Sequence, residues 1–361
     1  MRFLKRLCIS VVAAAVCATL VYFVCIPVVS TLFMPGEVRL SREEVSKKQS
    51  ISPNQYVLSA FDAPATDADG ATHAQVSLKL FGIFPIKKIN VEVMPFERVL
   101  AGGVPIGLVA KTDGVVTLMD AHGFRRGDVV TSVDNGAVTS VSDLERRLGK
   151  KNLSPYFKDD TSGIGTLTYI NPADNNFAAL GHMLVDYETG SSVNLRCGDV
   201  YACNLVGLEK SAGNRVGEMQ NTLKKSLGVQ GSIVSSNRNG IYGCLKEDSA
   251  ILDACKNNSY PVRSRYGVKP GRAQVLVALD GENVTPYDCD IIKAKFQRGS
   301  SDKGLVVRIT DERLLSATGG IVHGMSGSPI IQDGHLIGAL THVMGSDVTK
   351  GYGVYIDFVL P

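Results

Sequence analysis

Several features that identify common protein classes are missing from this sequence of 361 residues. The formal net charge is only +3, and no lysine–arginine block with interleaved aromatic residues is present. Such basic surfaces are typical of nucleic-acid-binding proteins, so we expect no nucleic-acid partner. No C-x-x-C pair and no histidine cluster has metal-ligand spacing, and we therefore expect no metal and no cofactor.

The cysteines do not predict a fully paired disulfide framework. Three of the eight (Cys8, Cys17 and Cys25) lie in an apolar N-terminal segment, and five lie outside it: Cys197, Cys203, Cys244, Cys255 and Cys289. The odd number outside leaves room for one or two bridges only. With 44% hydrophobic and 20% charged residues, the chain has the composition of a globular protein and the length of two domains plus an anchor.

A long uncharged segment runs from Leu7 to Phe33. As a helix it would be roughly 40 Å long, more than the ~30 Å of bilayer hydrocarbon. A cleaved signal peptide is the alternative, but its apolar core has only ~7–15 residues. Arg2, Lys5 and Arg6 precede the segment, which indicates a cytoplasmic N-terminus. We therefore expect a single-pass membrane protein with residues 1–6 as a cytoplasmic tip, 7–33 as a transmembrane anchor, and the remainder outside.

Two smaller regions follow the anchor. Residues 34–94 predict a polar stalk and then a β-hairpin, because Ala74–Phe81 and Lys88–Val93 alternate apolar and polar residues around a Gly82–Pro85 break. Residues 95–150 resemble a small PDZ-like α+β module, with a glycine loop before a strand, an Asn135-Gly136 turn and a helix start at Ser142. In such a module the loop residues Ile106, Gly107 and Leu108 would bind a peptide terminus.

Residues 160–361 have the pattern of a mostly β domain. Short alternating apolar runs recur about every ten residues, separated by Gly, Asn, Asp and Pro, which favours a sandwich or barrels. The runs are Gly165–Ile170, Phe177–Leu180, Gly231–Val234, Gln274–Leu279, Gly304–Ile309, Ser328–Ile331, Leu336–Leu340 and Gly353–Phe358.

The segment Gly324-Met325-Ser326-Gly327-Ser328-Pro329 predicts a nucleophilic serine. Glycines on either side allow a sharp turn and close approach of a substrate. In such a turn the amides of Gly324 and Ser326 can form an oxyanion hole. Glycine–serine turns are also common in loops without catalytic function, so the prediction depends on a base and a carboxylate nearby.

A serine hydroxyl needs a base to remove its proton, and six histidines are available. His182 follows the apolar strand ending at Leu180, where a barrel edge can present it across a cleft, and we expect it to be the base. His323 and His342 compete because both flank the nucleophile hairpin. Immediate neighbours in a strand usually point away, however, and the other three (His73, His122 and His335) lie in less suitable places.

The third expected member is a carboxylate that orients the imidazole. Asp311 ends a strand just before the nucleophile segment, and Asp186 and Asp199 are alternatives. Aspartate at that place is also a common helix N-cap, here ahead of Glu312–Ser316.

Several segments together resemble the stage IV sporulation protein B family of PDZ-bearing serine peptidases. They are Lys79–Gly82, Pro85–Lys88, Gly163–Thr168, Ala179–His182, Gly240–Gly243, Gly319–Val322 and Gly324–Pro329. The resemblance implies a trypsin-like double β-barrel with Ser326 as nucleophile, His182 as base and Asp311 as third member. By analogy with trypsin-like folds, Gly319–Val322 and Thr341–Val343 would line the specificity pocket. Met325 stands where trypsin-like enzymes carry an aspartate, so activation by a buried N-terminal amine is not expected.

The same resemblance implies the biology. The family acts between the two membranes of a developing spore, where it cleaves itself and a regulator of a membrane-embedded protease, which activates a late sigma factor. A different class of function remains open: an anchored binding protein whose PDZ-like module captures a partner while its peptidase domain is inactive. A general quality-control protease is less consistent, because such enzymes carry G-N-S-G-G-P and place the PDZ module after the protease.

Overall fold

The structure is a computed structural model that describes all residues except 1, 53, 63–64 and 67–71. The chain divides into two compact units, Met1–Glu97 and Arg98–Pro361. The chain as a whole is mostly β, as expected, and the second unit contains two six-stranded barrels.

The first unit consists of an apolar helical segment and a small mixed sheet. The helical segment comprises α1 (Arg2–Leu20), a π-helical turn (Val21–Cys25) and α2 (Ile26–Leu32). By length and composition, Ser10–Leu32 could cross a membrane. The remaining elements are β1 (Glu37–Leu40), α3 (Arg42–Ser46), β2 (Val57–Phe61), β3 (Ala65–Thr66), β4 (Thr72–Leu80) and β5 (Phe84–Val93).

β4 and β5 form an antiparallel hairpin in the region where one was predicted, and the residues before it contain strands and a helix instead of an extended stalk. β1 pairs in parallel with β5, and β2 pairs antiparallel with β4, which gives the order β1-β5-β4-β2. Val38, Leu40 and Val57 are buried in this sheet. Strands of four and five residues contain too few alternations to be recognised from sequence.

The first barrel closes because β7 pairs with strands on both sides. Its six strands, in ring order, are β7 (Pro105–Thr117), β11 (Phe157–Ile170), β12 (Asn176–Ala179), β18 (Gly240–Leu245), β17 (Gly231–Asn237) and β15 (Leu195–Glu209). Ile106, Leu108, Leu167 and Phe177 belong to its buried core. Three strands extend the same sheet beyond the ring: β6 (Arg98–Ala101), β8 (Val129–Val130) and β19 (Ser259–Pro261). Another, β16 (Glu218–Leu223), pairs with β15.

The second barrel contains β20 (Gly271–Val277), β21 (Thr285–Ala294), β22 (Leu305–Ile309), β25 (Asp347–Tyr355), β24 (His335–Met344) and β23 (Pro329–Gln332), in ring order. Val275, Ile330 and Tyr355 belong to its buried core. Outside the barrels lie β13 (Leu184–Val185), β14 (Ser192–Val193), η2 (Lys225–Leu227), α5 (Ala250–Cys255), η3 (Arg265–Gly267), α6 (Glu312–Thr318) and α7 (Ile356–Val359).

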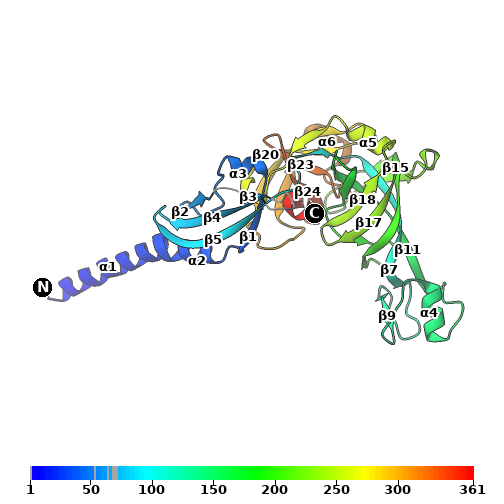
Figure 1. Cartoon of the computed structure of the whole chain (residues 1–361), viewed down its shortest axis with the longest axis horizontal. Helices are drawn as coiled ribbons and strands as arrows, with labels where there is room; N and C mark the ends of the chain where they lie inside the picture. Colours follow the sequence, from blue (N-terminus) through cyan, green and yellow to red (C-terminus); the bar gives the residue numbers. More distant parts are fainter. Residues whose placement is uncertain (1, 53, 63–64, 67–71) are drawn as a thin grey trace. The chain divides into compact units, whose positions relative to one another are not determined.

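The expected module of residues 95–150 is divided in the structure. Its first strands, β6 and β7, belong to the first barrel's sheet, and only about residues 118–156 form a separate small body inserted between β7 and β11. That body holds β9 (Ser132–Val133), β10 (Gly136–Ala137) and α4 (Val141–Leu148), at the far ends of β7 and β11 in Figure 1. Ser140, not Ser142, caps α4, because its hydroxyl accepts from the amide of Asp143.

Candidate active site

Ser326 lies in a tight turn immediately before β23. Gly324 and Gly327 on either side have φ values of +101° and +100°, a region that residues with a Cβ rarely adopt. A Cβ on Gly327 would also lie 2.0 Å from the carbonyl oxygen of Thr166. The turn therefore requires both glycines, for the reason that the sequence suggested.

The amides of Gly324 and Ser326 are held in fixed directions. The carbonyl of His323 accepts from the amide of Met219 at 2.9 Å, and the carbonyl of Met325 accepts from the amide of Ser328 at 3.0 Å. In a trans peptide the N–H points opposite to the C=O, so each bond orients the amide of the next residue. In the described part of the chain, neither amide donates to a main-chain carbonyl. Both can donate to an oxyanion, where one such donor is worth about 3–4 kcal/mol.

His182 is carried toward the second barrel by a sharp turn after β12. Leu180 and Gly181 have φ values of +72° and +71°. For leucine this conformation costs of order 1–3 kcal/mol, so the surroundings must hold it. The side chain of Leu180 packs where Gly165 leaves room: a Cβ there would lie 1.9 Å from Leu180 Cδ2. Gly181 packs against the side chain of Thr341 in the second barrel.

The imidazole of His182 is set up to act as a base. Its Nδ1 lies 2.7 Å from the carbonyl oxygen of Met183. A carbonyl only accepts, so Nδ1 carries the proton and Nε2 is left with a free lone pair. Burial, and then the charge of His342, lower the pKa of His182 below its ordinary value of 6.5, which favours the neutral form that a base requires.

A second histidine and a carboxylate lie beside this imidazole. The ring of His342 stacks on that of His182, with ring centroids 4.6 Å apart. Nε2 of His342 lies 2.8 Å from Oδ2 of Asp302, and the hydroxyl of Thr341 donates to the main-chain oxygen of Asp302 at 2.6 Å. The charge of Asp302 raises the pKa of His182 and so partly offsets the effect of His342.

His182 and Ser326 line one cleft of about 1320 Å³. It is also lined by Ile321, Val322, Thr341, His342 and Val343, which belong to the two segments expected to form the specificity pocket. In the structure, Oγ of Ser326 donates to the carbonyl of Thr341 at 2.6 Å instead of to His182. Catalytic hydrogen bonds often form only in the substrate complex, so this contact does not exclude His182 as a partner of Ser326.

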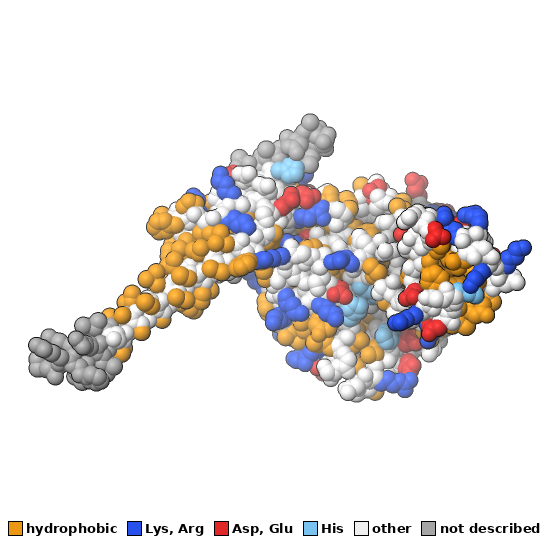
Figure 2. All heavy atoms as spheres, turned by 90° about the horizontal axis from the view of Figure 1, so that it is seen from below, with side chains coloured by type: hydrophobic (Ala, Val, Ile, Leu, Met, Phe, Trp, Pro, Cys, Tyr) orange, Lys and Arg blue, Asp and Glu red, His pale blue; other side chains and the backbone are white. Residues whose placement is uncertain are grey.

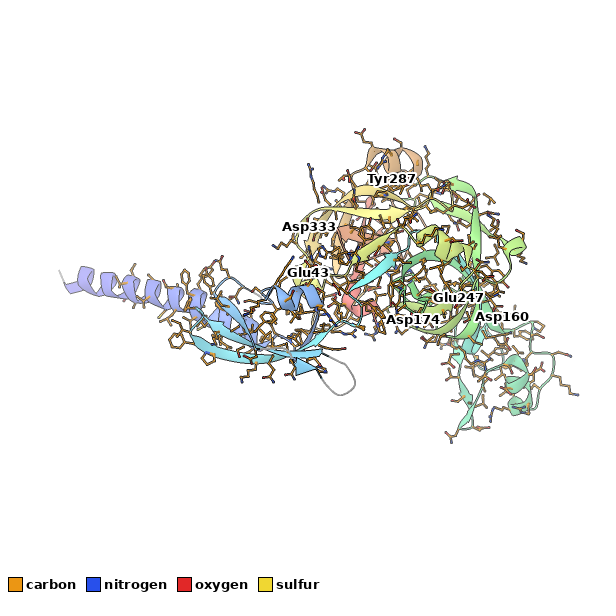
Figure 3. All side chains as sticks on the ribbon, turned by 45° about the horizontal axis from the view of Figure 1, so that its top comes forward. Glu43, Asp160, Asp174, Glu247, Tyr287 and Asp333 are labelled. Atoms are coloured by element: carbon orange, nitrogen blue, oxygen red, sulfur yellow. The ribbon has the colours of Figure 1, made fainter. Side chains whose placement is uncertain are left out.

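Asp311 is engaged elsewhere. Its carboxylate caps α6 by accepting from the amide of Arg313 at 2.9 Å, and it pairs with the Arg313 guanidinium at 2.7 Å. These hydrogen bonds hold the pKa of Asp311 far below its usual range. The Arg313 guanidinium also lies 5.1 Å over the ring of Tyr287, which is labelled in Figure 3. Asp311 is not among the residues that line the cleft.

The two alternative carboxylates differ in their surroundings. Asp186 lines the cleft but is committed to an ion pair with Lys158 at 2.8 Å and to the hydroxyl of Thr161 at 2.9 Å. Asp199 lies in β15, where its main chain pairs with β7 and β17, and it is exposed.

The three residues expected to bind a peptide terminus lie inside the first barrel. Ile106, Gly107 and Leu108 belong to β7, which is paired with β11 on one side and β15 on the other. Ile106 and Leu108 are fully buried. At these positions the structure presents no free strand edge to a peptide.

Sequence reasoning missed the residues that join the two barrels around the site. The main-chain amide of Thr166 donates to the carbonyl of Ser326 at 2.9 Å, and the hydroxyl of Thr166 donates to the carbonyl of Gly324 at 2.6 Å. The hydroxyl of Thr168 donates to the carbonyl of Gly327 at 2.9 Å. Alternating threonines in a strand are too common to indicate this role. Asp302 was missed as well, because it lies in a loop of unremarkable sequence.

Comparison with known proteins adds an independent observation. Residues 149–360 match the family model described as SpoIVB peptidase S55. No curated protein matches the chain.

Proposed function

Because the chain belongs to the SpoIVB peptidase S55 family of serine peptidases, we propose that it is a membrane-anchored serine endopeptidase in which Ser326 is the nucleophile and His182 the base. One observation carries the assignment of residues. Ser326 and His182, which come from different barrels, line the same cleft beside two amides whose directions are held.

The geometry supports acyl-enzyme chemistry. Nε2 of His182 takes the proton of Ser326 as Oγ attacks the carbonyl carbon of the scissile peptide. The amides of Gly324 and Ser326 stabilise the resulting oxyanion. The imidazolium then gives its proton to the leaving amine, which breaks the C–N bond. Water, activated by the same histidine, hydrolyses the ester and frees Ser326.

Two carboxylates are candidates to support the base. Asp311 stands at the position that the family pattern implies, and it holds the start of α6, whose end leads into the nucleophile segment. It would therefore act on catalysis by positioning that segment. Asp302 reaches the base through His342. Meanwhile the carbonyl of Met183 already fixes the tautomer of His182.

The substrate and the location are part of the same proposal. The family implies cleavage of the chain itself and of a regulator of an intramembrane protease, in the pathway that activates a late sigma factor during sporulation. Residues 10–32 would anchor the enzyme, with the barrels outside the membrane that they cross. Ile106, Gly107 and Leu108 are paired on both sides within the first barrel, so we assign substrate capture to the cleft.

The test is to purify the full chain in detergent beside its Ser326→Ala variant and to follow both by gel and intact mass. A fluorophosphonate, which labels an activated serine, is added to parallel samples. We expect the parent to trim itself and to gain one label, whereas the variant stays whole and unlabelled. His182→Ala should also stay whole and unlabelled.

Each other outcome has a definite meaning. If the parent is labelled but not trimmed, the serine chemistry stands and self-cleavage fails. If neither protein is labelled or trimmed, the domain is inactive and the anchored binding protein becomes the better description. Equal trimming and labelling of the parent and Ser326→Ala would refute Ser326 as the nucleophile.

A further inference from the structure

The turn between β4 and β5 exposes an apolar tip. Every residue from Phe81 to Pro85 is exposed, and Ile83 and Phe84 are 71% and 61% exposed. Leu58, on neighbouring β2, adds a further exposed apolar side chain. Figure 2 shows hydrophobic side chains along the helical segment and over the adjoining part of the first unit. Exposed large apolar residues that adjoin in this way mark a surface with a partner.

The tip is joined to the apolar helix by aromatic contacts. The ring of Tyr56 lies 5.2 Å from that of Phe23 and 6.2 Å from that of Tyr22, both in the π-helical turn. On its other side, Tyr56 lies 6.3 Å from the ring of Phe81. Its carbonyl accepts from the amide of Phe81 at 2.7 Å. The tip and the helix therefore meet at the level of residues 22–23.

Polar contacts show where the helix leaves an apolar environment. The side-chain amide of Asn54 donates to the hydroxyl of Ser30 at 3.0 Å. The ammonium of Lys87 donates to the main-chain carbonyls of Leu32 and Met34. An ammonium and an amide at this level are costly within hydrocarbon. The hydrocarbon must therefore end before Ser30. Residues 7–23 alone would span about 25 Å, near the lower limit for a transmembrane helix.

Tyrosine, here Tyr22 and Tyr56, is favourable at a membrane boundary because its ring is apolar while its hydroxyl meets water. The four rings of Tyr22, Phe23, Tyr56 and Phe81 lie together at the level where the hydrocarbon would end. The hairpin from Leu78 to Asn90 also carries three lysines and no acidic residue, which suits anionic lipid headgroups.

We propose that the β4–β5 tip, Phe81–Phe84, is a second membrane contact that inserts into the outer leaflet beside the anchor. It would reach roughly 5–10 Å below the headgroups, the depth at which interfacial segments lie. The proposal rests on the proposed anchoring of the chain, and the partner it names is the lipid bilayer itself.

The main chain at the tip agrees with this role. Phe81 has a φ of +51°, and Gly82 follows with +74°. Glycine or asparagine would occupy such a turn without strain, whereas a bulky residue there is an outlier. The Phe81 ring packs against that of Tyr56 and is still 46% exposed, which leaves part of it available for a contact outside the protein.

The chain contains no tryptophan, so one introduced tryptophan reports a single place. We would place it in the full chain at the tip (Phe84→Trp), within the helix (Val12→Trp) or on the second unit (Phe296→Trp). All three side chains are exposed in the structure. Each variant is reconstituted into vesicles of phosphatidylcholine and phosphatidylglycerol, with lipids brominated either near the headgroup or near the chain end as quenchers. Ile83→Trp repeats the tip measurement at a neighbouring position.

We expect both tip variants to be quenched several-fold, most strongly by bromine near the headgroup, with emission at shorter wavelength than Phe296→Trp. Val12→Trp, about 15 Å below the level of Tyr22, should be quenched more by bromine near the chain end. If Val12→Trp is quenched and neither tip variant is, the anchor stands and this inference is overturned. If no variant is quenched, the anchor fails and the inference fails with it. Equal quenching of Phe296→Trp would show that the tip is not distinct and would also overturn it.

Discussion

The contact between Thr166 and the nucleophile turn allows a quantitative test of how the two barrels build the site. Thr166→Val keeps the shape and the main-chain bond to Ser326 but removes the hydroxyl that donates to Gly324 at 2.6 Å. Thr166 is buried, so removal of its hydroxyl leaves the Gly324 carbonyl without this donor. An unsatisfied buried acceptor costs about 1–3 kcal/mol of free energy. If that cost falls on the oxyanion turn, the transition state loses the same amount, and the rate drops about 5–150-fold.

The assay is the second-order rate of fluorophosphonate labelling at Ser326, measured together with the free energy of unfolding in urea. Thr168→Val is the matched control, because its hydroxyl crosses the same interface but donates to Gly327, beyond the two oxyanion amides. We expect similar losses of stability and a clearly larger loss of labelling rate for Thr166→Val. Equal labelling rates for the two variants would refute the claim that Thr166 supports the oxyanion turn.

Three further predictions concern charge and modularity. The lowered pKa of His182 should place the acidic limb of the pH profile of the labelling rate below pH 6.5. His342→Asn removes a positive charge and should move this limb to higher pH, whereas Asp302→Asn removes a negative charge and should move it to lower pH. Because the pKa of Asp311 lies far below 3.8, its ionised form contributes stability above about pH 4 that is lost as the pH falls through the folded value. Asp311→Asn should therefore flatten the decline of unfolding free energy in urea between about pH 4 and pH 2. Replacement of residues 119–155 by a short Asn-Gly turn should leave the labelling rate of Ser326 unchanged, because Val116 and Lys158 are already paired.

The fold could be predicted from sequence where strands are long and alternate regularly. The runs at Gly165–Ile170 and Leu336–Leu340 lie on barrel strands, and the run at Phe177–Leu180 lies on β12 except for Leu180, which begins the turn. The boundary of the small body within residues 118–156 was not predictable in the same way. The glycines at the start of β7 are typical of a ligand-binding loop. In the structure they make room for packing instead: at Gly107, a Cβ would collide with the side chain of Leu223 from β16.

The site was predictable only where the chemistry depends on local residues. The glycines around Ser326 are needed by the turn itself, so the motif alone indicates it. The contacts of His182 depend on tertiary packing: its Nδ1 partner is a main-chain carbonyl, which no residue type reveals, and its neighbour His342 comes from the other barrel. An aspartate between a strand and a helix can be either a catalytic carboxylate or a helix N-cap, and the sequence pattern at Asp311 fits both. In the structure Asp311 makes the contacts of an N-cap.

The division of Ser326 and His182 between two barrels has a consequence for the chain during synthesis. Proteins generally fold from the N-terminus as they leave the ribosome, so the first barrel and its histidine can form early. The nucleophile turn becomes ordered only when β24 and β25 have emerged to close the second barrel, since Gly327 donates to Leu340. A nascent or prematurely terminated chain would carry the proposed base without an ordered turn for the proposed nucleophile. Peptidase activity would thus appear only in the completed polypeptide, which protects the cell from hydrolysis by partial translation products.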